Sequence, residues 1–178
     1  YDPVLGWTFH GHEVVGSRWI PKIFQGLKMP LNEKMKYVQK LVALHLRPIA
    51  LVTEEVTDSA VRRLLFDAGN DIDDLMVLCN ADITSKNPRK VARLHANFEL
   101  VKLKLVEVEE KDAIRNFRNP ITGDYVMELF NIQPCNMIGQ LKEMVKNAIL
   151  DGEIENTFEA ADAFMRVKAA EMGLSPVK

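Results

Sequence analysis

Three histidines and one aspartate are the residue types from which a metal site can be built. His10 and His12 lie in one short segment, whereas His45 and Asp82 lie in separate segments further along the chain. Imidazole nitrogens and a carboxylate from different helices of a bundle can converge on one divalent ion. His12, His45 and Asp82 alone make an incomplete set of ligands. Their spacing leaves two interpretations open: a metal centre that other groups complete, or hydrogen-bonded polar residues that pack between helices.

Basic side chains gather in three places and predict a surface that binds phosphate. They are Arg62, Arg63, Lys86, Arg89, Lys90, Arg93, Arg115 and Arg118. On a helix, Arg89, Lys90 and Arg93 share roughly one face near the N-terminus, where backbone N–H groups favour a phosphate. Residues 83–118 hold 9 Lys or Arg against 5 Asp or Glu, although the net charge of the chain is −2. Solvated surface charge is the alternative interpretation of each residue.

Other chemistries find no support. The sequence has no Gly-rich phosphate loop, no G-x-S-x-G elbow and no H-E-x-x-H pair. Asp71, Asp73 and Asp74 resemble a cation cluster, but acidic residues at a helix start are favoured by the macrodipole. Cys79 and Cys135 match no metal spacing, and we expect reduced, buried thiols in a cytoplasmic protein. No run of about 18 apolar residues occurs, so we expect no membrane span.

Helical periodicity dominates the chain, and alternating β-branched runs are rare. We therefore expect an all-α fold, a helical bundle or array. Thr8 predicts the cap of a first helix over about 9–26 with Pro21 inside it, and Asn32 predicts a second helix that ends near 45–46, before Pro48. Further helices are expected over 57–69, 70–84, 123–130, 136–150 and 157–173, with a long helix from Pro88 onward.

The long helix carries an apolar stripe at spacings of three and four residues. Its members are Val91, Leu94, Phe98, Val101, Leu105 and Val108. Such a stripe is more typical of a packing seam than of a recognition surface, and it could also join copies of the chain. Asn119-Pro120 has turn chemistry and predicts a boundary between a domain at 1–118 and a smaller one at 119–178. The start at Tyr1, without an initiator Met, indicates a piece of a longer protein.

A series of short motifs resembles the helical region of bacterial CCA-adding tRNA nucleotidyltransferases and related poly(A) polymerases, which carry a domain of the HD superfamily. The motifs are Thr8-Phe9-His10-Gly11-His12-Glu13-Val14-Val15-Gly16, Leu44-His45-Leu46-Arg47-Pro48, Thr57-Asp58-Ser59-Ala60-Val61-Arg62-Arg63-Leu64 and Ala81-Asp82-Ile83-Thr84-Ser85-Lys86-Asn87. A C-terminal series from Ile121-Thr122-Gly123 to Leu150-Asp151-Gly152 is similar to the tail of that family. Each motif is modest, but their order is specific and covers about residues 5–165.

The resemblance implies a division of labour within the whole enzyme. A head with paired carboxylates and two magnesium ions transfers CMP and AMP to the tRNA 3′ end, and a neck selects the nucleotide. The helical body and tail hold the acceptor arm of the tRNA through its backbone shape. This chain corresponds to the body and tail, with a partial HD-type domain at 1–118 and a helical tail at 119–178. The resemblance therefore implies tRNA binding without catalysis by this segment alone.

The resemblance also implies roles for the polar residues. His12, His45 and Asp82 match the later metal ligands of an HD site, while the first His and the His-Asp pair are expected upstream of Tyr1. The alternative function is a metal-dependent phosphohydrolase that acts on nucleotides or cyclic phosphates. The sequence departs from the family at Pro134-Cys135-Asn136, where a Pro-Gly-Pro-like turn is usual. That departure weakens any carried-over RNA contact at this turn.

Overall fold

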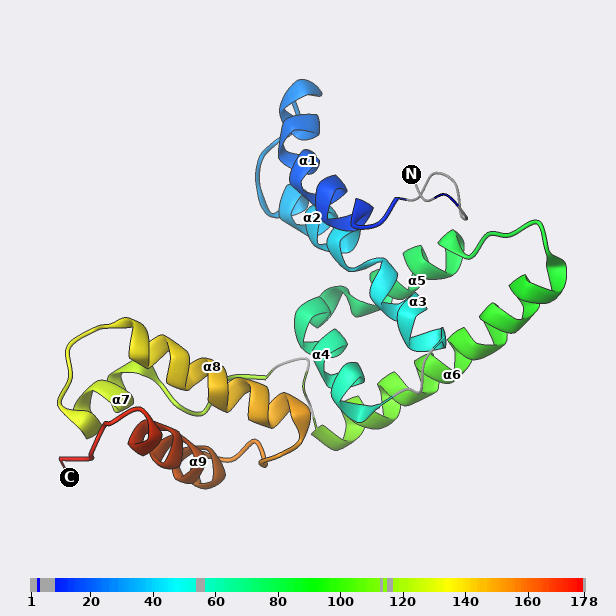
Figure 1. The fold of residues 1–178 in the computed structure, drawn as a ribbon. Coiled ribbons are helices and arrows are strands. Elements are labelled where there is room, and N and C mark those ends of the chain that lie inside the picture. The colour runs from blue at the N-terminus through cyan, green and yellow to red at the C-terminus, as the bar shows by residue number, and fades with distance from the viewer. Residues whose placement is uncertain (1–2, 4–8, 54–56, 113, 115–116, 178) are drawn as a thin grey trace. The chain divides into compact units, whose positions relative to one another are not determined.

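The computed structural model describes residues 3, 9–53, 57–112, 114 and 117–177, and every regular element in them is a helix (Figure 1). The all-α prediction is confirmed. The chain divides into two compact units, one made of residues 1–56 and 67–105 and the other of residues 57–66 and 106–178. The boundary that the sequence predicts between 118 and 119 stays a prediction. No helix in the described residues is long and apolar enough to cross a bilayer.

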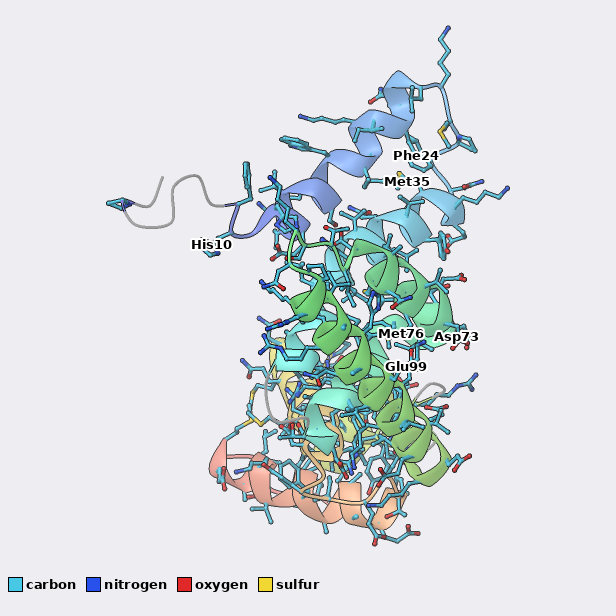
Figure 2. All side chains as sticks on the ribbon, turned by 90° about the vertical axis from the view of Figure 1, so that its right-hand side faces the viewer. His10, Phe24, Met35, Asp73, Met76 and Glu99 are labelled. Atoms are coloured by element: carbon cyan, nitrogen blue, oxygen red, sulfur yellow. The ribbon has the colours of Figure 1, made fainter. Side chains whose placement is uncertain are left out.

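The first unit begins with a helical hairpin of α1 (His12–Gly26) and α2 (Glu33–Leu44), which lie side by side in Figure 1. α1 buries Ile20 and Phe24, and Figure 2 labels Phe24 on α1 and Met35 on α2. Gly16 allows close approach, because a Cβ atom there would lie 3.2 Å from the Val42 side chain.

Pro21 lies inside α1 and cannot donate a backbone hydrogen bond to the Ser17 carbonyl one turn earlier. The side-chain amide of Gln39 on α2 donates to that carbonyl at 3.0 Å. The bond that the proline removes is thus replaced from the neighbouring helix, and the replacement ties α1 to α2.

The helix starts follow the predicted capping residues in most places. The Asn32 side chain accepts from Lys34 N at 3.1 Å, and the Asn87 side chain accepts from Arg89 N and Lys90 N at 3.0 and 3.3 Å. The first helix is the exception, since α1 begins at His12 rather than near residue 9 and follows Gly11, whose φ is 75°. Thr8, the predicted cap, lies outside the described residues.

The segment after α2 contains a helix that the sequence did not predict, α3 (Leu46–Thr53). Pro48 was interpreted as a stop signal, but it occupies the first turn of α3, where a backbone N–H has no partner to lose. The short 3₁₀ helix η1 (Gly69–Asp71) and α5 (Ile72–Asp82) follow α4 (Asp58–Ala68). Gly69 has a φ of 56°, as expected for a glycine after a helix end.

Polar contacts join α2 to the segment that leads into α5. Lys40 donates to the Ala68 carbonyl at 3.1 Å and forms an ion pair with Asp71, and Tyr37 donates to Asp74 at 2.9 Å. Two of the three acidic residues, Asp71 and Asp74, therefore have a side-chain partner in addition to the favourable helix dipole.

α6 (Pro88–Asp112) is the long helix, and its apolar stripe is a packing seam as predicted. Phe98, Val101, Leu105 and Val108 are buried, while Val91 and Leu94 are partly buried. His95 of α6 is held by the Asn80 side chain of α5, whose Oδ1 atom lies 3.0 Å from Nδ1 of His95.

The second unit contains α7 (Gly123–Phe130), α8 (Asn136–Asp151) and α9 (Phe158–Glu171), close to the predicted bounds. Thr122 and Thr157 cap α7 and α9, and Gly152 ends α8 with a φ of 76°. The core of these helices consists of Ile121, Val126, Leu129, Phe130, Ile138, Leu141, Val145, Ile149, Ala161, Met165 and Ala169.

Candidate functional site

His12 and His45 meet directly, although 33 residues and both helices of the hairpin separate them in the sequence. Their Nε2 atoms lie 3.1 Å apart and their ring centroids 5.1 Å apart. His12 is the first residue of α1 and His45 directly follows α2, so the packing of the hairpin brings the two rings together. The interpretation in which the two histidines share one site has its geometric basis here.

The other ring nitrogens fix the protonation pattern of this pair. Nδ1 of His12 lies 2.8 Å from the Phe9 carbonyl, and Nδ1 of His45 lies 2.7 Å from the Val42 carbonyl. Because a carbonyl oxygen only accepts, both Nδ1 atoms carry a proton. Two neutral rings would then point two lone pairs at each other. The contact is favourable when a proton or a cation lies between the Nε2 atoms.

Glu13 adds negative charge beside the pair. Its Oε2 atom lies 3.9 Å from Nδ1 of His12 and is buried without a hydrogen-bond partner. A buried carboxylate oxygen without a partner is costly unless positive charge lies nearby. A cation bound at the histidine pair would offset the cost of this buried oxygen.

Asp82 does not join the pair. It ends α5, three residues after Cys79, whose thiol donates to the His45 carbonyl at 2.9 Å. α5 therefore lies against the His45 backbone, but the described residues hold no group of three or more His, Cys, Asp or Glu side chains suited to a metal. Of the three predicted ligands, the structure brings two together.

This donor set fits a divalent ion only loosely. A 3.1 Å separation is close to that of two nitrogens bound to one ion at about 2.0–2.1 Å each. Both Nδ1 atoms donate to carbonyls, as is usual for metal-bound histidines. Structural metal sites use about four protein ligands, and the described residues supply two. Water or a substrate oxygen would have to complete the coordination.

The basic cluster at the start of α6 is exposed to solvent. Lys86, Arg89, Lys90 and Arg93 are all exposed. Asn87 already accepts from the N–H groups of Arg89 and Lys90, so the helix end contributes its dipole more than free backbone donors. Among the described residues, none of the four cations has an acidic partner. This α6 cluster presents four positive charges within about two helical turns.

Arg62 and Arg63 are held by other parts of the second unit. The Nη2 atom of Arg63 donates to both carboxylate oxygens of Asp151, at 2.9 Å to Oδ1 and 2.8 Å to Oδ2. Its Nη1 atom donates to Oδ1 of Asn147 at 3.2 Å. The Arg62 side chain is 11% exposed and lies 3.9 Å from Asp58. It also fills the space that a side chain at Gly152 would need. These contacts give both arginines a packing role at the C-terminal end of α8.

The remaining predicted residues divide between described and undescribed positions. Arg118 is exposed, and Arg115 lies outside the described residues. His10 is exposed just before α1 and is labelled in Figure 2.

We expected both cysteines to be buried, which is wrong for Cys135, because it lies exposed at the N-cap of α8. Burial raises the pKa of the Cys79 thiol to about 12, with the charge of Asp82 adding to the effect, so this thiol is unreactive at neutral pH.

Sequence reasoning missed two features of these sites. The first is Glu13, which directly follows His12 in the sequence, so its place beside the histidine could have been inferred. Asp151, the partner of Arg63, gave no signal because it lies 88 residues away in the sequence.

No protein-family model, curated protein or solved structure gives a significant match to this chain.

Proposed function

We propose that this chain is the tRNA-holding body and tail of a CCA-adding tRNA nucleotidyltransferase, with a partial HD-type body over 1–118 and a helical tail over 119–178. The observation that carries the proposal is the α6 cluster of Lys86, Arg89, Lys90 and Arg93, which is exposed and unopposed by acidic partners in the described residues. The order of the sequence motifs and the all-helical fold support it.

The α6 cluster suits a phosphate backbone better than a base edge. Four cations near one helix end can neutralise several phosphates, and the positive end of the helix dipole adds to their field. Phosphate contacts release counterions, so affinity should fall steeply as salt rises. Among the eight predicted arginines and lysines, this cluster and Arg118 are exposed, whereas Arg62 and Arg63 are held within the second unit.

Titration of fluorescent tRNA with the chain at several salt concentrations tests the proposal. The double variant Arg89→Ala/Arg93→Ala should bind more weakly, and the slope of log K against log salt should fall by about 1 to 2 because up to two phosphate contacts are lost. Lys34→Ala/Lys111→Ala removes two exposed cations, from α2 and from the C-terminal end of α6, and is the matched control. Affinity for tRNA that is insensitive to salt, or equal losses in the two variants, would reject the proposal.

A second candidate function is favoured by one observation, the facing Nε2 atoms of His12 and His45 beside the partnerless Glu13 oxygen. In a metal-dependent phosphohydrolase these histidines would hold the ion, which would supply Lewis-acid chemistry at a phosphate. The Nδ1 bonds to the carbonyls of Phe9 and Val42 would orient the two imidazole rings towards the ion.

Elemental analysis and an assay with a 2′,3′-cyclic nucleotide and Ni²⁺ or Mn²⁺ separate the two functions. Turnover that is lost in His45→Ala would establish the hydrolase. Asp82→Ala should leave such turnover largely intact if His12 and His45 hold the ion without Asp82. If the chain binds no metal and shows no turnover, the hydrolase function is rejected and tRNA binding stands as the proposal.

A further inference from the structure

The outer side of α1 carries a row of exposed apolar residues. Val15, Trp19 and Ile23 of α1 and its C-cap residue Leu27 recur every four residues, and their exposed fractions are 44%, 59%, 46% and 66%. Residues at this spacing lie one above another on a helix and form a ridge. We call these four residues the α1 ridge. α1 already buries Ile20 and Phe24. A helix that is apolar on two sides lacks a neighbour on one of them.

Cations line one edge of the α1 ridge. Arg18 and Lys22 are exposed and precede Trp19 and Ile23 by one residue each. Among the described residues neither has an acidic partner, and the nearby Glu33 pairs with Lys36. The α1 ridge is therefore apolar along its length and positive along one side.

α5 presents exposed apolar residues with carboxylates around them, so its charge is opposite to that of the α1 ridge. Its inner side buries Ile72, Leu75, Met76 and Cys79. On its outer side Val77 and Leu78 are 71% and 39% exposed, and Ala81 is exposed as well. Asp73, Asp74 and Asp82 surround these apolar residues and are exposed too, with Asp73 and Met76 labelled in Figure 2. We call Asp73, Asp74, Val77, Leu78, Ala81 and Asp82 the α5 face.

Charge decides what can cover these two surfaces. Two α1 ridges packed on each other would bring cations against cations, and two α5 faces would bring carboxylates against carboxylates. An α1 ridge against an α5 face pairs opposite charges around an apolar centre. At 1.5 Å per residue, the α1 ridge spans about 18 Å from Val15 to Leu27 and the α5 face about 13 Å from Asp73 to Asp82.

We propose that the α1 ridge of one copy of this chain packs against the α5 face of a second copy. The contact does not depend on RNA binding, since the α6 cluster takes no part in it. It also differs from pairing through the long apolar stripe of α6, whose central members are buried within the chain. An anionic membrane would attract the cations of α1 but would leave the α5 face uncovered, so a second copy accounts for both surfaces.

Light scattering after size-exclusion chromatography tests the contact. The mass should rise above 20.2 kDa with increasing protein concentration, because each contact between a ridge and a face adds a copy. Trp19→Glu and Val77→Glu should each keep the chain monomeric, because each places a charge at the apolar centre. Val167→Glu replaces a residue of α9 that is 58% exposed and should self-associate like the unaltered chain. A monomer at every concentration would overturn the proposal, as would loss of association in the Val167 variant alone.

Charge reversal gives the sharper experiment. Arg18→Glu/Lys22→Glu makes both surfaces acidic, and Asp73→Lys/Asp82→Lys makes both basic, so each variant alone should be monomeric. An equimolar mixture should associate again, because each contact then joins opposite charges. Circular dichroism checks that both variants keep their helices. Two monomeric variants whose mixture stays monomeric would overturn the proposal, and so would Trp19-dependent sedimentation of the monomer with anionic vesicles, which would assign the ridge to a membrane.

Discussion

At the scale of single residues, the hairpin depends on a hydrogen bond that comes from outside the helix it serves. Gln39 donates to the Ser17 carbonyl, which Pro21 leaves without its usual partner. A carbonyl in this partly buried position costs about 1–3 kcal/mol when its partner is removed. Gln39 and Pro21 should therefore be energetically coupled, although they never bond each other.

This coupling can be measured by a double-mutant cycle. Gln39→Leu should lower the free energy of unfolding by about 1–2 kcal/mol when residue 21 is proline. In a Pro21→Ala background the new N–H can bond the Ser17 carbonyl, so Gln39→Leu should cost clearly less. Denaturant unfolding of the four proteins gives both costs. Equal costs in the two backgrounds would mean that the amide of Gln39 does not replace the missing bond.

Single residues also show how far sequence predicted the candidate sites. The pairing of His12 with His45 agrees with the interpretation that grouped them, since both stand at helix ends that a hairpin brings together. The separate position of Asp82 was beyond prediction, because it depends on how α5 packs on the hairpin. The ion pairs of the arginines could not be predicted either. Arg62 and Arg63 resemble surface cations in the sequence, but they pair with carboxylates of α4 and α8.

At the scale of elements, local signals predicted the helices well wherever a cap decided the boundary. Asn32, Asn87, Thr122 and Thr157 each bond a backbone N–H in the following turn, as side-chain chemistry requires. α3 was missed because a proline both ends helices and fits their first turn, and only the tertiary contacts of Leu46–Thr53 decide between the two.

The contact of α4 with the C-terminal end of α8 is the element-scale feature with a pH signature. Hydrogen bonds from Arg63, and then from Ser59, hold the pKa of Asp151 below its usual value of 3.8. A carboxyl with a lowered pKa in the folded state adds stability above its unfolded pKa and loses that contribution as pH falls through the folded value. The contribution of Asp151 is therefore complete near neutral pH and fades below about pH 4.

Arg63→Met should accordingly destabilise the chain by about 0.5–1 kcal/mol at pH 7, the usual range for a partly exposed ion pair. The difference from the unaltered chain should shrink as pH falls from 5 towards 3. Denaturant unfolding across this range measures it, and Asp151→Asn serves as the matched control with little pH dependence of its own at this site. A carboxyl titration of Asp151 at or above its usual pKa would contradict the assignment.

At the scale of the whole molecule, the all-α class followed from periodicity because a helix is a local structure. The division into compact units did not follow, since residues 57–66 group with 106–178 through contacts such as Ser59 with Asp151, 92 residues apart. Exposed apolar surface was equally invisible in the sequence. The stripe of α6 and the α1 ridge have similar patterns, yet the first is largely buried and the second is open.

The tail offers the clearest test at this scale. Its core residues all lie between Ile121 and Ala169, so a fragment of residues 119–178 contains every buried member of that cluster. The fragment lacks Ser59 and Arg63, which bond Asp151, and Phe66, whose ring lies beneath the Lys146 ammonium. It also lacks Phe117, which packs against the tail core. A unit of about 60 residues is marginal on its own. We therefore expect the fragment to fold, with a lower melting temperature than the whole chain.

Circular dichroism and thermal melting of the fragment check this expectation. A cooperative melt should be abolished by Leu141→Ala, because truncating a fully buried leucine costs about 2–5 kcal/mol, which is comparable to the stability of so small a domain. Met144→Ala on the exposed side of the same helix should leave the melt nearly unchanged. A fragment with little helix would place the domain boundary elsewhere, because the tail would then need α4 to fold. Adding residues 57–66 in trans as a peptide should in that case restore the helical signal.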